Sequence, residues 1–214
     1  MECAGLVGEA VGTEVFFTDA REIMALFITS MKRGTGTESD ADMSLFDHVL
    51  PACARISKAL GVHFEPYVQT FMEPLLIGAN QETEFSMVDA NEDEQEGDVN
   101  QDEDTGVETA IVSLGGGVKK RVTLNTHTLQ QKNQAARVLY EFAVGLRGHL
   151  KTFISPSLQT LLALIKDKHL ADLRASAFLA IAKMFDACIH AVQCGFPISS
   201  TPTASPLHEL EVSL

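Results

Sequence analysis

Amphipathic stretches recur in pairs along this chain, and the spacing of the pairs leaves few folds open. Six stretches place apolar residues at the three- and four-residue steps that are typical of one helix face. These stretches are residues 19–33, 43–61, 63–79, 126–150, 151–167 and 169–192. The first members of successive pairs begin near residues 19, 62 and 149, so the first interval is about 43 residues. This is the length of a HEAT repeat, a unit of two stacked helices.

The second interval is about 87 residues, which is twice the first. Removing roughly residues 81–123 leaves about 44, so we interpret that segment as an insertion between the two helices of one repeat. The sequence therefore predicts an all-α fold, an α-solenoid of about three HEAT-type helical hairpins over residues 1–192. We expect a disordered tail over 193–214. Because the first residues already show a helical pattern and only about three pairs are found, we expect a piece of a longer solenoid or an incomplete gene model.

Within the helices, apolar side chains at helical spacing are expected to face the core. Pro51 and Pro74 are expected to kink their helices, whereas Pro66 fits a first turn and Gly61 fits a C-terminal cap. The expected core positions include Leu26, Phe27, Val68, Phe71, Leu139, Phe142, Leu161, Leu162, Met184, Phe185 and Val192.

The insertion carries almost all of the excess charge of the chain. Residues 91–106 read NEDEQEGDVNQDEDTG, with eight acids and no base. Between Glu82 and Glu108 there are twelve acids and no Lys or Arg, and the remaining residues hold 17 acids against 16 bases. The net charge of −13 is thus local, and the segment is expected to be solvated and disordered. Behind it, two β-rich runs in 109–126 flank three glycines and predict a short hairpin.

Several classes of function lack support in the sequence. A nucleic-acid partner needs a basic stripe, and the only basic run is Lys119 to Arg121. No run of eighteen apolar residues predicts a membrane span. The spacing of Cys188, His190 and Cys194 resembles half a zinc site but matches no standard pattern, so no metal is expected. No catalytic motif is found, and we expect neither an enzyme nor a cofactor.

Three segments carry a resemblance to a known family. They are LVGEAVG at 6–12, FEPYVQTFMEPLLIGA at 64–79, and ETAIVSLGGGVKKRVTLNTHTLQQKNQAARVLYEFAVGL at 108–146, with the acidic insert before the third. In this order and spacing they resemble the importin-β superfamily of nuclear transport receptors, in its importin-5 (karyopherin β3) branch. The resemblance extends from about residue 3 to residue 192.

The resemblance implies a receptor that carries cargo through nuclear pores and is found in the cytoplasm and the nucleus. The implied partners are basic cargo proteins, the GTP form of the Ran GTPase, and nuclear pore proteins. Acidic side chains that could contact a basic partner are Glu92, Asp93, Glu94, Glu96, Asp98, Asp102, Glu103 and Asp104 in the insert, and Glu141 and Asp186 on second helices. Three alternatives stay open: a HEAT scaffold for another assembly, an acidic chaperone for basic proteins, and a loop that only improves solubility.

Overall fold

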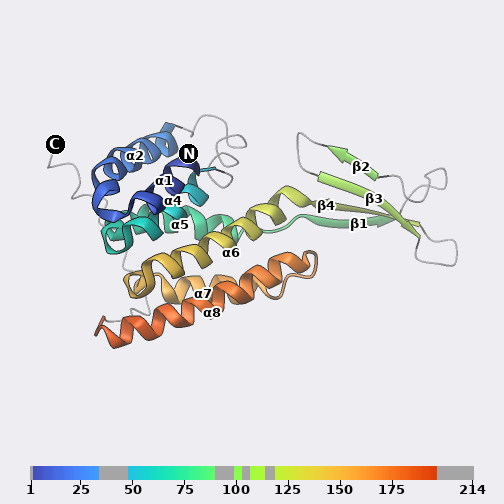
Figure 1. Ribbon diagram of the computed structural model, residues 1–214. Coiled ribbons are helices and arrows are strands. Elements are labelled where there is room, and N and C mark those ends of the chain that lie inside the picture. Colours follow the sequence, from blue (N-terminus) through green and yellow to red (C-terminus); the bar gives the residue numbers. More distant parts are fainter. Residues whose placement is uncertain (1, 34–47, 90–98, 103–106, 114–118, 197–214) are drawn as a thin grey trace.

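The computed structural model describes residues 2–33, 48–89, 99–102, 107–113 and 119–196 (Figure 1). Two short 3-10 helices, η2 (Gly61–Tyr67) and η3 (Arg147–Leu150), precede α5 and α7. The α-helices are α1 (Glu2–Val11), α2 (Thr13–Arg33), α4 (Leu50–Leu60), α5 (Val68–Ala79), α6 (Thr126–Leu146), α7 (Ile154–Leu164) and α8 (Ala171–Gln193). The strands are β1 (Phe85–Asp89), β2 (Val99–Asp102), β3 (Val107–Ser113) and β4 (Lys119–Asn125).

The helices stack as the predicted solenoid. Helices α1, α4, α6 and α8 follow one another in a row, each packed on the next, while α5 and α7 meet on the other side of the stack (Figure 1). The hairpins are α2 with α4, α5 with α6, and α7 with α8. The predicted fold class is therefore confirmed, with α1 as a further helix at the head of the row.

A continuous apolar core runs through the stack. Phe64 in η2 lies between Phe71 of α5 and Phe142 of α6, with ring centroids 6.2 and 5.7 Å away. Gly145 lets α6 approach α4 closely, because a Cβ at this position would lie 3.0 Å from the backbone nitrogen of Lys58. The close approach explains why one glycine is tolerated in the last turn of a long helix.

Several expected details of the helices are wrong. Pro51 lies in the first turn of α4, where its missing N–H costs nothing, and so it does not kink the helix interior. Pro66 lies inside η2, and α5 begins only at Val68. Pro74 does lie inside α5, as expected.

Four of the expected core residues are exposed. Leu26, Leu162, Phe185 and Val192 have 68%, 53%, 56% and 62% of their surface accessible. The other expected core residues named above, among them Phe142, Leu161 and Met184, are buried. A helical period marks an apolar face, but only a neighbouring helix buries it. These four side chains lie on faces that none of the described residues covers.

The insertion contains a larger sheet than the predicted hairpin. Strands β3 and β4 form that hairpin, and β1 and β2 add to its two edges in the order β1-β4-β3-β2, all antiparallel. A two-stranded hairpin alone is marginal in water, so the two extra strands account for its persistence. The sheet projects from the stack at the N-terminal end of α6 (Figure 1).

Candidate functional site

Most of the predicted contact residues lie outside the described residues. These are Glu92, Asp93, Glu94, Glu96, Asp98, Glu103 and Asp104, and the predicted disorder of the insert and the predicted tail also fall largely outside them. Asp102 ends β2, where its backbone pairs with that of Val107. The domain boundaries and the role of these acids stay predictions.

The sheet fixes where the acidic segment leaves and rejoins the fold. Asp89, the last residue of β1, pairs in register with Lys120, and Val99, the first residue of β2, pairs with Ala110. Lys120 lies next to the end of β4 that is remote from α6, whereas Ala110 lies in the middle of β3, level with Val122 of β4. Of the two described residues that bound 90–98, Asp89 therefore lies near the outer end of the projecting sheet and Val99 lies at its middle.

Polar contacts attach the sheet to the helices. The Asn125 side chain accepts a hydrogen bond from the Thr128 backbone N–H at 3.0 Å and so caps α6. Lys132 of α6 donates to the Thr83 hydroxyl at 2.7 Å, just before β1. Burial lowers the pKa of Lys132, and the nearby carboxylates of Asp167 and Glu82 partly oppose that shift.

The basic run of β4 adjoins the acidic segment. The Lys120 ammonium lies 3.4 Å from the carboxylate of Asp89, the residue directly before the undescribed part of the insertion. The basic run therefore neutralises part of the negative charge at the start of the acidic segment. Asp89 is largely exposed, so the pair contributes little to stability.

The two acids predicted on second helices are described, and both are already paired. Glu141 of α6 forms an ion pair with Lys58 of α4, and both side chains are about one-third exposed. Asp186 of α8 accepts a hydrogen bond from Lys183 at 2.9 Å. A basic partner would have to compete with these lysines at both positions, so neither is an unengaged acceptor.

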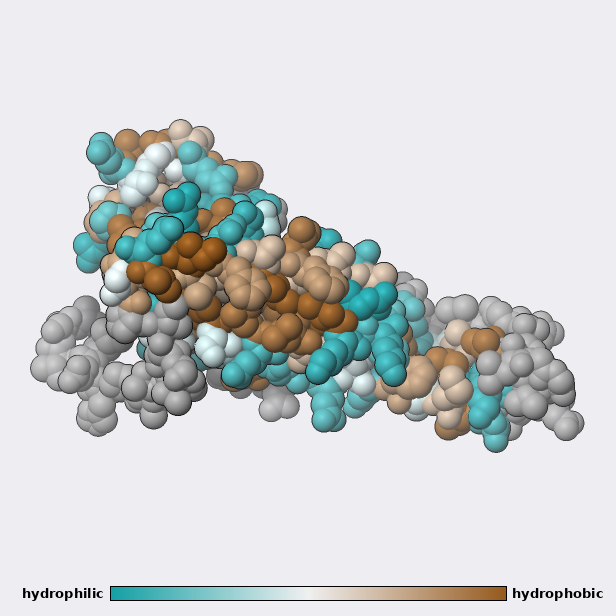
Figure 2. All heavy atoms as spheres, turned by 90° about the horizontal axis from the view of Figure 1, so that it is seen from below, coloured by the Kyte–Doolittle hydropathy of each residue, from teal (hydrophilic) through white to brown (hydrophobic). Residues whose placement is uncertain are grey.

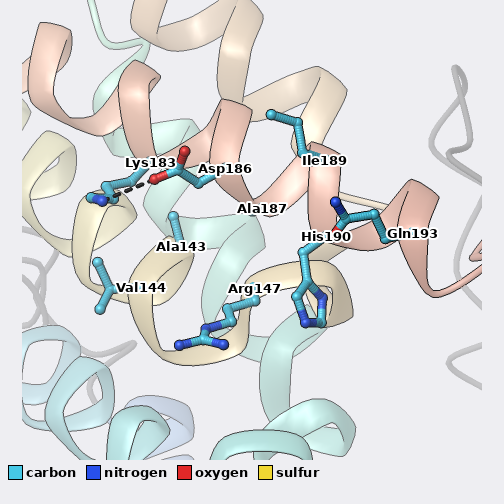
Figure 3. A pocket seen from close by; sticks show the side chains of 9 residues that line it. All are labelled: Ala143, Val144, Arg147, Lys183, Asp186, Ala187, Ile189, His190 and Gln193. Carbon is cyan, nitrogen blue, oxygen red and sulfur yellow. Dashed lines mark hydrogen bonds and ion pairs between the residues drawn. The ribbon is translucent and has the colours of Figure 1, made fainter.

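Asp186 also borders a cavity of about 320 Å³ between the C-terminal ends of α6 and α8 (Figure 3). Its floor is apolar and includes Ala143 and Val144, and its polar rim includes Arg147, Lys183 and His190. This rim was not predicted from the sequence. The signal was present in the similar turns LGVH at 60–63 and LRGH at 146–149, where one repeat has Gly61 and the other has Arg147.

The described residues contain no group of three or more His, Cys, Asp or Glu side chains that could hold a metal ion. His190 and Cys194 approach each other, with 3.7 Å between Nδ1 and Sγ, and Cys194 is exposed. By length and composition alone, one helix in the described part of the chain, α8, could cross a membrane. Its inner face packs on α6, α7 and η3, as expected for a layer of the stack.

Comparison with known proteins supports the resemblance seen in the sequence. No family model matches the chain. Importin subunit beta-3 of Saccharomyces cerevisiae is 27% identical over 172 residues, which is 80% of this chain and 14% of that protein. The resemblance to the importin-β superfamily is therefore confirmed, and the chain spans about one-seventh of the length of this curated relative.

Solved structures of Kap121p share the fold. The complex with Nup53p superposes with a TM-score of 0.68 at 23% identity and covers 89% of this chain and 17% of Kap121p. The complex with RanGTP gives a TM-score of 0.65 at 20% identity over 90% of this chain and 17% of that chain. A further crystal structure of Kap121p gives a TM-score of 0.66 at 21% identity, over 89% of this chain and 17% of that chain.

Proposed function

We propose that this chain is a binding segment of an importin-β-like nuclear transport receptor and that it is not an enzyme. The observation that carries the proposal is the match to importin subunit beta-3 over 80% of the chain, together with the stacked helical fold. A receptor of this kind would work in both the cytoplasm and the nucleus.

The acidic segment is the proposed contact for basic partners. Solved structures show Kap121p bound to RanGTP, to Nup53p and to Ste12p, and we propose partners of the same three kinds here: the GTP form of Ran, a nuclear pore protein and a basic cargo. A local excess of carboxylates raises the association rate of a basic protein, and salt weakens this effect. Each exposed pair would contribute only about 0–1 kcal/mol, so the whole segment must act together.

A capture experiment tests the proposal. The immobilised chain is exposed to Ran loaded with GTP or GDP and to a Lys- and Arg-rich cargo peptide, at low and at high salt. We expect selective capture of the GTP form, and we expect capture of the cargo peptide to weaken as salt rises.

A matched pair of variants locates the contact. One variant replaces the eight carboxylates of residues 92–104 by their amides, and the control replaces Glu141 and Asp186 in the same way. The variant of residues 92–104 should lose most of its capture of Ran and of the cargo peptide. The control variant should keep that capture, because Lys58 and Lys183 already pair with the carboxylates of Glu141 and Asp186. Equal capture by both variants would contradict a role for the acidic segment.

The segment from Glu82 to Glu108 contains twelve acidic residues and no Lys or Arg. This composition also favours a second candidate function, that of a chaperone for basic proteins. Under that function the chain would capture histone-like peptides without regard to the nucleotide on Ran. Capture of neither Ran nor basic peptides would instead favour a HEAT scaffold for another assembly.

A further inference from the structure

Two equivalent turns of the solenoid adopt the same unusual backbone conformation with different residues. Gly61 follows α4 with φ 54° and ψ −123°, and Arg147 follows α6 with φ 47° and ψ −124°. Among the described residues, Arg147 is the only non-glycine residue with positive φ. A residue with a Cβ occupies this region at an energetic cost that glycine avoids. The second repeat therefore keeps an arginine where the first has the residue best suited to the turn.

Packing of the turn does not explain the arginine. The neighbouring Gly148 is the residue that packs against α8, since a Cβ there would lie 2.9 Å from both Ala191 Cα and His190 Nδ1. At Gly61, by contrast, a Cβ would meet no atom within 4 Å. The turn conformation alone thus favours glycine at both positions. The second repeat differs from the first only in carrying the side chain of Arg147 at this position. Strain of this kind is concentrated at functional sites.

The guanidinium of Arg147 borders the cavity between α6 and α8 (Figure 3). On the opposite rim, Lys183 is hydrogen-bonded to Asp186 at 2.9 Å, and that bond raises the pKa of the lysine. Among the described residues, the guanidinium has no hydrogen-bond or ion-pair partner. The rim therefore holds two permanent cations and one carboxylate, and the carboxylate is already engaged by Lys183.

From these observations we propose that the cavity binds an acidic side chain of a partner protein, with Arg147 as its anchor. The planar guanidinium presents paired N–H donors that match the two oxygens of a carboxylate. The apolar floor, which includes Ala143, Val144 and Ala187, suits the methylene groups of a glutamate and its neighbours. The volume of about 320 Å³ holds a side chain rather than a large ligand.

The site is separate from the acidic segment and selects the opposite charge. The sheet joins α6 at its first residue (Figure 1), and residues of the last turn of α6 line the cavity. A helix of 21 residues is about 31 Å long, which is several times the screening length of roughly 8 Å at physiological salt. The charge of the acidic segment is therefore screened from the cavity, and the proposal does not depend on the proposed function.

The test uses the full chain and a fluorescein-labelled nonapeptide of alternating Glu and Leu, with a Gln and Leu peptide as the matched probe. Fluorescence anisotropy should show tighter binding of the Glu peptide. Arg147→Gly should weaken that binding by about tenfold to a hundredfold, the range for a hydrogen bond to a charged group. The same variant should melt about 2–4 °C higher, because it restores the glycine that the turn favours. Arg147→Lys, which keeps the charge but loses the paired donors, should bind with intermediate affinity.

Four results would overturn the proposal. Equal binding of the Glu and Gln peptides would mean that only the apolar floor attracts them. Unchanged binding of the Glu peptide by Arg147→Gly would mean that the arginine does not anchor it. A lower melting temperature of that variant would mean that the arginine stabilises the turn and is a structural residue. Displacement of the peptide by inorganic phosphate at an equal concentration would mean that the cavity accepts any free anion.

Discussion

Helices α6 and α8 are both long second helices of a hairpin, yet they bury very different side chains. Helix α6 has α4 on one side and α8 on the other, and it buries large residues such as Leu139, Phe142 and Leu146. Helix α8 buries mostly small residues against α6, and only 28% of its most apolar stretch is buried. Its exposed large residues are Phe178, Leu179, Phe185, Ile189 and Val192.

The exposed residues of α8 form a regular seam. Ala171, Ala175, Phe178, Ala182, Phe185, Ile189 and Val192 follow each other in alternating steps of four and three, the spacing of a helix–helix contact. Figure 2 shows the underside of the molecule as a broad hydrophobic band in this region. The comparison teaches that burial in a stacked fold depends on the neighbours of a helix more than on its own pattern.

The largest expected difference between the two helices concerns their phenylalanines. Phe142→Ala removes a side chain that is 1% exposed and should lower the free energy of unfolding by about 3–5 kcal/mol. Phe185→Ala, the matched change at a residue 56% exposed, should change it by less than about 1 kcal/mol. Urea unfolding followed by circular dichroism measures both. Equal losses would show that the outer face of α8 is covered in solution.

Cysteines provide a probe of the same difference. Cys53 of α4 is buried, and this burial raises the pKa of its thiol well above 9.0, whereas Cys194 beyond α8 is exposed. At pH 8, alkylation of Cys53 should be at least about a hundredfold slower than alkylation of Cys194, because it requires opening of the core. Mass spectrometry of timed samples gives the two rates, and comparable rates would mean that the α4 layer opens readily.

The raised pKa of Cys53 also predicts a loss of stability at alkaline pH. The unfolded thiol ionises near its ordinary pKa of 9.0, while the folded thiol stays protonated to a higher pH. Stability from the neutral thiol is therefore fully present below pH 9 and is lost as the pH rises above it. Cys53→Ala should remove this part of the pH dependence, and melting curves of the two proteins across pH 8–10 would measure it.

Close packing of the interior helices predicts a smaller effect. Gly145→Ala would place a Cβ 3.0 Å from Lys58 N and Ser57 Oγ, so α6 must shift away from α4. The expected cost is about 1–3 kcal/mol in the free energy of unfolding, as for other overpacked cores. An unchanged urea midpoint would mean that the two helices separate without loss.

Ion pairs should show the smallest difference. Glu141→Gln breaks a pair that joins α4 to α6 and should cost about 1 kcal/mol, since both partners are only about one-third exposed. Asp186→Asn breaks a pair within α8 and should stay within about 0.5 kcal/mol. Thermal melts at low and high salt compare them. A larger loss for Asp186→Asn would reverse the assignment of interior and end helices.

The sequence predicts the order of the helices because their apolar residues recur every three or four residues, as on one face of a helix. It does not predict which of two apolar faces is covered, and for that reason Phe185 was expected in the core and is exposed. The hairpin was predicted from its β-rich runs and glycines, whereas β1 was missed although Phe85, Ser86 and Met87 alternate in polarity. The cavity rim was missed, because the only signal for the positive φ of Arg147 is the similarity of its turn to the one at 60–63, where Gly61 takes the same position.

The insertion leaves and rejoins the helical stack at neighbouring positions. The Asn125 backbone N–H donates to the Glu84 carbonyl oxygen at 3.1 Å, so the outgoing and returning strands are neighbours where they join the helices. A segment whose two ends are already held together can grow, shrink or be exchanged without changing the distance that α5 and α6 must span. The solenoid can therefore carry a variable appendage at this corner while its own spacing stays constant.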